Sequence, residues 1–228
     1  MKNKNPFKRL TKFEWGLWIV SVLVVSISFM TAGNVSYLTL IASLTGVTAL
    51  VFVSKGDVAG QVLIVLFSLL YAVISYQFRY FGEMITYLGM SAPIAAMSVV
   101  SWLRNPYQDT AEVKVHRLNR GQFVRLVVFT ALVTWGFYYI LAAFGTNNLF
   151  MSTVSIATSF SASYLMLYRS PWYALAYAGN DIVLIVLWVL ATLADRSFLP
   201  MIVCFVMFFF NDIYGFLNWR KMRARQRG

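Results

Sequence analysis

Two carboxylates stand inside long apolar stretches of this chain, and they are the residues best suited to do chemistry. Asp181 follows Asn180, and the same pair recurs as Asn211 and Asp212. A carboxylate at the centre of a membrane helix costs about 3 kcal/mol to insert, so it faces the protein interior or a water-filled cavity. Interhelical hydrogen bonds return only about 0.6 kcal/mol on average. This balance favours substrate binding over a structural role for Asp181, whereas the two roles weigh equally for Asp212, which lies near the end of its stretch.

Aromatic side chains flank Asp181 at helical spacing. Tyr177 lies four residues before it and Trp188 seven residues after it, so the three share one helix face. A stripe of ring, carboxylate and ring suits a flat, cationic heterocycle through stacking and cation–π attraction. The competing interpretation is ordinary aromatic packing, which is common at 17% aromatic content. Tyr76 and Gln77, at the end of another apolar stretch, could reach a ribose. The predicted substrate-binding residues are Tyr76, Gln77, Tyr177, Asn180, Asp181, Trp188, Asn211 and Asp212.

Residue patterns typical of several enzyme classes are missing from the sequence. The single cysteine, Cys204, lies in an apolar run and permits neither an intramolecular disulfide nor a cysteine metal site. The single histidine, His116, lies in a basic segment between two longer apolar stretches. The sequence contains no metal-ligand cluster, phosphate-binding loop or paired-carboxylate motif. We therefore expect no catalytic residues, no metal and no cofactor. An integral-membrane enzyme acting on lipids and a non-transporting sensor or assembly subunit are the alternatives from other classes.

The elements that carry these residues are long apolar stretches. Hydrophobic residues make up 60% of the 228 residues and charged residues only 12%, which is typical of membrane proteins. A membrane-spanning helix needs about 20 apolar residues, and runs such as residues 62–67 do not alternate as barrel strands do. We predict an all-α polytopic membrane protein with eight spans, at residues 13–30, 34–53, 58–77, 84–103, 123–143, 149–168, 172–194 and 198–219.

The distribution of basic residues predicts the orientation. With both termini in the cytoplasm, 17 of the 19 Lys and Arg fall on the cytoplasmic side, and only Arg79 and Arg196 fall outside. The net charge of +11 is therefore a topology signal, and we expect no nucleic-acid partner. The first stretch has no signal-peptide cleavage site and contains Glu14, so we treat it as a retained helix in contact with membrane lipids.

The second half of the chain echoes the first. Residues 62–67 are matched by residues 183–188, each after a short basic loop, and Trp102-Leu103-Arg104 is matched by Trp219-Arg220. An odd joining helix between two three-helix units makes a parallel repeat, which leaves a pathway between two bundles. The predicted segments are an N-terminal helix (1–33), a first bundle (34–104), a basic loop with a linking helix (105–146), a second bundle (147–219) and a basic tail (220–228).

Several of these motifs carry a resemblance to a known family. Lys55-Gly56, Ser75-Tyr76, Pro93 with Trp102, and above all residues 212–220 resemble the PnuC family of bacterial vitamin transporters. The resemblance implies two parallel three-helix bundles with a linking helix, similar to the SWEET transporters. It also implies a place in the bacterial cytoplasmic membrane and facilitated diffusion of nicotinamide riboside. A cytosolic kinase that traps the substrate by phosphorylation is the implied functional partner, and a homo-oligomer is left open.

The family holds nicotinamide on a tryptophan-rich stretch followed by an asparagine. Asn180 matches the polar position of that motif, whereas Ala176 and Tyr177 stand where a tryptophan is expected. Because of this departure, a relative that carries thiamine, riboflavin or a deoxynucleoside is the alternative within the family.

Overall fold

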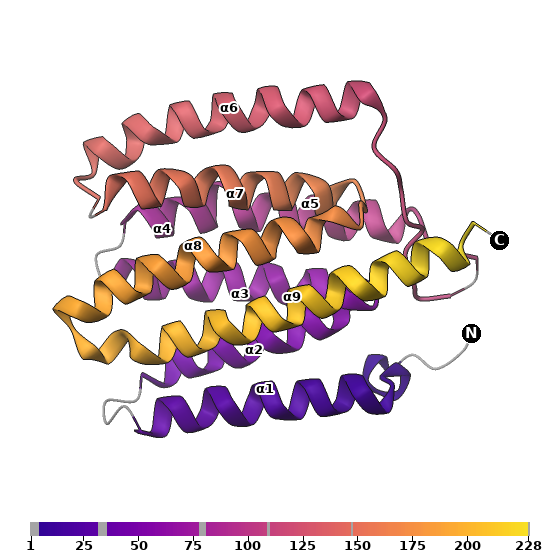
Figure 1. The fold of residues 1–228 in the computed structure, drawn as a ribbon, viewed down its shortest axis with the longest axis horizontal. Helices are drawn as coiled ribbons and strands as arrows, with labels where there is room; N and C mark the ends of the chain where they lie inside the picture. Colours follow the sequence, from indigo (N-terminus) through magenta and orange to yellow (C-terminus); the bar gives the residue numbers. More distant parts are fainter. Residues whose placement is uncertain (1–4, 32–35, 78–80, 109, 147, 228) are drawn as a thin grey trace.

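A computed structural model describes residues 5–31, 36–77, 81–108, 110–146 and 148–227. Lys2, Lys4, Arg79 and the predicted start of the second span at residue 34 lie outside the described residues. The long helices run side by side along one axis and form an elongated bundle (Figure 1).

The helices follow the apolar stretches of the sequence closely. Within the described residues, eight segments are long and apolar enough to cross a membrane, which confirms the predicted all-α membrane fold. Helices α4 and α5 form a single span together with the π-helical turn η2 between them. The elements are η1 (Pro6–Arg9), α1 (Lys12–Thr31), α2 (Tyr37–Ser54), α3 (Val58–Gln77), α4 (Phe81–Thr86), η2 (Tyr87–Ser91), α5 (Ala92–Leu103), α6 (Arg120–Ala143), α7 (Leu149–Leu167), α8 (Trp172–Ala194), η3 (Arg196–Phe198) and α9 (Leu199–Arg225).

Two span boundaries differ from those expected. The fourth span begins at Phe81 rather than at residue 84, so that Glu83 lies inside a helix and is 6% exposed. The last helix continues to Arg225, beyond the predicted end at residue 219. Its last turn holds Arg223 and Arg225, whose positive charges complement the negative end of the helix dipole, so the helix extends past its apolar stretch.

The helices pack in two groups. Helices α2, α3 and α5 are neighbours, as are α7, α8 and α9, and α2 packs against α9 across the two groups. Helix α6 packs mainly on α7, and α1 packs on α2 and α9. The turn between α2 and α3 is tight because Gly60 brings the two backbones together: a Cβ there would lie 2.4 Å from the Val53 nitrogen.

A reciprocal pair of tryptophans joins the two groups. Trp102 of α5 donates to the Met166 carbonyl of α7 at 3.2 Å, and Trp219 of α9 donates to the Val53 carbonyl of α2 at 2.9 Å. The two indole rings lie 5.4 Å apart. Such reciprocity is compatible with a parallel repeat, and the repeat and the five predicted segments themselves stay predictions.

Most of the basic loops gather at one end of the bundle, which we call the basic end. The turn η1, the end of α9, the turn after α2, the segment before α6 and the turn after α7 all lie there (Figure 1). Backbone hydrogen bonds tie them together: Val113 donates to Gly56 at 2.9 Å, and His116 donates to Arg169 at 3.0 Å. The segment between α5 and α6 is thus an ordered cap, held to both groups of helices.

Candidate substrate-binding cavity

A small cavity lies in the middle of the bundle, between α2, α3, η2, α7, α8 and α9. We call it the central cavity, and its volume is about 50 Å³. Apolar and aromatic side chains form much of its wall, and polar groups converge on it from five elements, α3, η2, α7, α8 and α9. The lining residues are Leu50, Ile64, Phe67, Ser68, Tyr87, Ser91, Ser159, Met166, Tyr177, Asn180, Asp181, Leu184, Phe205, Phe208 and Asp212.

Two carboxyl groups define the electrostatics of the central cavity. Asp181 of α8 is 3% exposed and Asp212 of α9 is 4% exposed, and the two carboxyls lie close enough to interact directly. Oδ2 of Asp181 is buried and has no hydrogen-bond partner among the described residues. The lining residues include no Lys, Arg or His. Two buried carboxylates without a base repel each other, and a shared proton or a bound cation relieves that repulsion.

Helix α7 fixes the orientation of Asn180. The amide oxygen Oδ1 of Asn180 accepts hydrogen bonds from Thr158 Oγ1 at 2.7 Å and from Ser159 Oγ at 3.1 Å. Because both hydroxyls occupy the oxygen, the amide NH₂ is the part of Asn180 that can donate to a ligand. One turn earlier, the Tyr177 hydroxyl pairs with Ser163 Oγ at 2.8 Å. Hydroxyls of α7 therefore hold the polar face of α8 in place.

A π-helical turn brings the fourth span to the central cavity. Turn η2 supplies Tyr87 and Ser91 to the lining, and the ring of Tyr87 lies 4.3 Å from that of Tyr71. Pro93 follows directly, and it lacks the N–H that would bond to the carbonyl four residues earlier. A proline inside a helix breaks the regular hydrogen-bond pattern, and the structure accommodates Pro93 with this wider turn. Such π turns are frequent at functional sites.

The structure brings four of the eight predicted residues together. Tyr177, Asn180, Asp181 and Asp212 all line the central cavity. Trp188 is buried farther along α8, where its ring lies 5.4 Å from that of Phe198, and it is not among the lining residues.

The other three predicted residues lie elsewhere. Asn211 donates to Ser21 Oγ of α1 at 3.0 Å, so it tethers the N-terminal helix. Tyr76 is 62% exposed and Gln77 is also exposed, at the end of α3. Their roles at a substrate stay predictions.

Several cavity residues escaped the sequence analysis. Ser68, Ser91 and Ser159 are small hydroxyl residues of the kind that lets membrane helices pack closely, so their composition did not set them apart. Phe205 and Phe208 sit in an uninterrupted apolar run. A usable signal was Pro93, because the helix break that it forces lies beside Tyr87 and Ser91.

Glu14 provides a contrast to the two cavity carboxylates. It is 1% exposed, and its carboxylate accepts hydrogen bonds from Lys55 Nζ at 2.9 and 3.2 Å and from the Tyr214 hydroxyl at 2.8 Å. The backbone nitrogen of Thr11 donates to it at 2.7 Å. This acid is fully matched by donors, as expected of a structural ion pair, whereas Asp181 and Asp212 are not.

Comparisons with known proteins agree with this geometry. Residues 36–221 match the family model described as nicotinamide mononucleotide transporter. The nicotinamide riboside transporter PnuC of Neisseria mucosa is 29% identical, over 99% of this chain and 87% of its own length. The protein of the same name from Haemophilus influenzae is 24% identical, over 92% and 90%. A crystal structure of the vitamin B3 transporter PnuC superposes with a TM-score of 0.83 at 26% identity, covering 95% of this chain and 94% of that one.

Proposed function

The chain belongs to the nicotinamide mononucleotide transporter family, and we propose that it carries nicotinamide riboside across the bacterial cytoplasmic membrane. The observation that carries the proposal is the pair of buried carboxyls, Asp181 and Asp212, in a central cavity whose lining has no basic residue. An ionisable group inside a membrane span marks a substrate or ion pathway by default.

The charge of the central cavity distinguishes the riboside from the mononucleotide. Nicotinamide riboside carries a positive pyridinium ring and no phosphate, so its charge is opposite to that of the carboxylates. The mononucleotide adds a phosphate that is negatively charged at neutral pH. Phosphate recognition requires Arg, Lys or a set of backbone donors, and the lining residues include no basic side chain. The acid-lined cavity therefore favours the riboside.

The remaining lining residues suit the other parts of a nucleoside. The rings of Tyr177, Tyr87 and Phe208 offer flat surfaces for the pyridinium, where cation–π attraction adds to stacking. The Asn180 amide and the Ser159 hydroxyl offer hydrogen bonds to the carboxamide or the ribose. The cation thiamine fits the charge argument equally well and is the second candidate.

Transport requires the central cavity to widen. A cavity of about 50 Å³ is much smaller than the roughly 300–1,000 Å³ of typical ligand sites. The α2–α3–α5 and α7–α8–α9 groups would therefore rock apart around the cavity, with the flexible joint at η2 and Pro93. We infer that the basic end faces the cytoplasm, in agreement with the positive-inside rule.

The same electrostatics would make uptake one-way. The substrate would cross by facilitated diffusion, and a cytosolic kinase would add a phosphate to it. The product would then carry negative charge, which Asp181 and Asp212 repel. Phosphorylation would thus trap the vitamin without any ion coupling in the transporter.

Calorimetry on the purified protein tests the substrate. We expect nicotinamide riboside to bind at least tenfold more tightly than nicotinamide mononucleotide, riboflavin or a deoxynucleoside. Thiamine is measured in the same way, to decide between the two cationic vitamins. Tighter binding of the mononucleotide would overturn the charge argument. Uptake of labelled riboside into liposomes, recovered chemically unchanged, distinguishes a transporter from a membrane enzyme or a sensor.

A further inference from the structure

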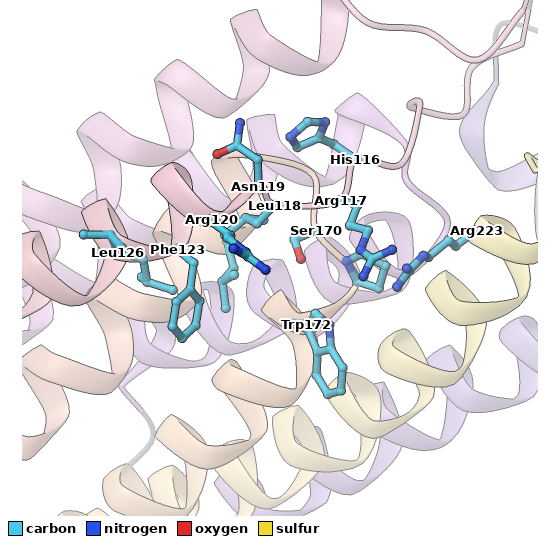
Figure 2. Close-up of a pocket in the computed structure, with 13 residues that line it drawn as sticks. His116, Arg117, Leu118, Asn119, Arg120, Phe123, Leu126, Ser170, Trp172 and Arg223 are labelled. Carbon is cyan, nitrogen blue, oxygen red and sulfur yellow. The ribbon is translucent and has the colours of Figure 1, made fainter.

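A second hollow lies at the basic end, far from the buried carboxyls. We call it the basic-end pocket, and its volume is about 730 Å³. It is formed by the segment before α6, the start of α6, the turn between α7 and α8, and the last turns of α9 (Figure 2). Arg117, Arg120 and Arg223 line it together with His116, and no Asp or Glu is among its lining residues.

Nearby acids are engaged elsewhere. Glu112 pairs with Arg225, Asp57 pairs with Arg9 at 2.7 Å, and Glu14 pairs with Lys55. No ion pair involves the three pocket arginines within the part of the chain that the structure describes.

The arginines of the pocket are also close to one another. Arg117 and Arg223 lie near enough to repel each other, and their side chains extend toward one another in Figure 2. Like charges held together in this way favour an anion between them. A phosphate group is the natural partner, because guanidinium groups bind its oxygens in pairs.

The pocket also has an apolar wall. Leu126, Leu165 and Pro171 are buried beside it, while Phe123 and Trp172 are 59% and 53% exposed. Arg120 is the first residue of α6 and Trp172 is the first residue of α8, so the pocket lies where two apolar helices begin. In a bilayer, this is the depth at which lipid phosphates meet acyl chains, and tryptophan is enriched there.

We propose that the basic-end pocket binds an anionic phospholipid, with its phosphate between Arg117, Arg120 and Arg223 and an acyl chain along Phe123 and Leu126. A free phosphate ester would use the same arginines but would leave the apolar wall without a partner. Basic pockets between membrane helices on the cytoplasmic side bind anionic head groups in this manner. The proposal holds whichever vitamin the central cavity carries.

Native mass spectrometry of the purified protein, equilibrated with phosphatidylglycerol or phosphatidylcholine, tests the site. We expect one phosphatidylglycerol to be retained at least tenfold more tightly than phosphatidylcholine. Glycerol 3-phosphate and inorganic phosphate should displace it only weakly. Equal retention of the two lipids would overturn the proposal. Ready displacement by glycerol 3-phosphate would assign the pocket to a soluble phosphate compound and would overturn the lipid assignment as well.

A matched pair of triple variants localises the effect. Arg117→Gln, Arg120→Gln and Arg223→Gln together should weaken phosphatidylglycerol retention by about 100-fold, at about fivefold for each arginine. The control combines Lys12→Gln, Arg104→Gln and Lys221→Gln, which removes the same charge from exposed residues outside the lining. An equal loss in both variants would show non-specific attraction and would contradict the site. Should the first variant not fold, Arg117→Gln alone against Arg104→Gln gives the same comparison at about fivefold.

Discussion

The central cavity and the basic-end pocket share helices α7, α8 and α9 but have opposite charge. The cavity is lined by two carboxyls and no base, and the pocket by three arginines and no acid. Helix α8 contributes Asp181 to the first and Trp172 to the second, separated by about 14 Å along the helix axis. Helix α9 contributes Asp212 and Arg223, separated by about 16 Å.

The environment of each region accounts for this division. The three arginines lie at or beside the ends of helices, near water and lipid phosphates. Clustered positive charge costs little free energy there. Two carboxyls in the middle of a bundle are costly to bury and have no base among the lining residues, so their retention indicates a cationic ligand or a proton. Glu14 sharpens the contrast, because it is an acid at the basic end and it is paired with Lys55. Acids with a partner should matter for stability, and acids without one for binding.

The largest expected effect is on the unpaired acids. Asp181→Asn keeps the shape and removes the charge, so we expect riboside affinity to fall about 100-fold, equivalent to about 2.7 kcal/mol. Because the wild-type carboxyl is buried without a base, the same change should leave the thermal midpoint equal or higher. Calorimetry and thermal unfolding measure the two quantities. Asp195→Asn, at an exposed residue that caps η3, is the control and should change neither. A large fall in the midpoint with unchanged affinity would assign Asp181 to structure.

The paired acid should behave in the opposite way. Lys55→Met leaves the buried Glu14 without its cation, so we expect the free energy of unfolding to fall by about 2 kcal/mol while riboside affinity stays within about twofold. The control is Arg225→Met, which breaks the more exposed pair with Glu112 and should cost less than about 1 kcal/mol. Thermal unfolding with and without riboside checks both. Equal destabilisation by the two variants would remove the distinction between a buried and an exposed pair.

The sequence was sufficient to predict the fold for a physical reason. A bilayer requires about 20 apolar residues for each helix, so hydropathy locates the spans directly, and the predicted stretches match the eight observed segments closely. Asp181 could also be identified from the sequence, because a carboxylate inside a membrane span costs free energy whichever way the helix is rotated. The predicted last helix ended too early, because its charged final turns carry no hydropathy signal.

The rest of the site could not be predicted because the sequence does not fix how each helix is rotated. In α3 nearly every residue is apolar, so nothing in the pattern shows that Ser68 faces inward while Tyr76 and Gln77 lie at an exposed end. Asn211 illustrates the same limit: its partner is Ser21 of α1, a helix whose docking position has no sequence signature. Glu83 was placed outside a span because Arg79, Gly82 and Glu83 lower the local hydropathy and obscure where the span begins.

An intermediate effect should come from crowding the wall of the central cavity. A Cβ at Gly46 would lie 2.3 Å from Cζ of Phe208, and that ring, which lines the central cavity with Asp181 and Asp212, must then shift. We expect Gly46→Ala to weaken riboside binding about tenfold, because the displaced ring occupies ligand space. Gly179→Ala is the matched control, since nothing lies within 4 Å of its Cβ position. Both variants leave the lipid affinity of the basic-end pocket unchanged if the two regions are independent.

The smallest effect tests how the cavity is held rather than what it binds. Thr158 Oγ1 donates to Asn180 Oδ1 at 2.7 Å, and Thr158→Val removes that donor with little change in volume. Ser159 still holds the amide, so we expect riboside affinity to fall only about fivefold, near the 1 kcal/mol of one hydrogen bond. Thr153→Val removes a similar hydroxyl from α7, bonded to the Leu149 carbonyl, and should have no effect on binding. Calorimetry compares the two. A loss as large as that of Asp181→Asn would mean that the orientation of Asn180, rather than the carboxyl charge, dominates recognition. The electrostatic contrast between the two regions would then not explain substrate choice.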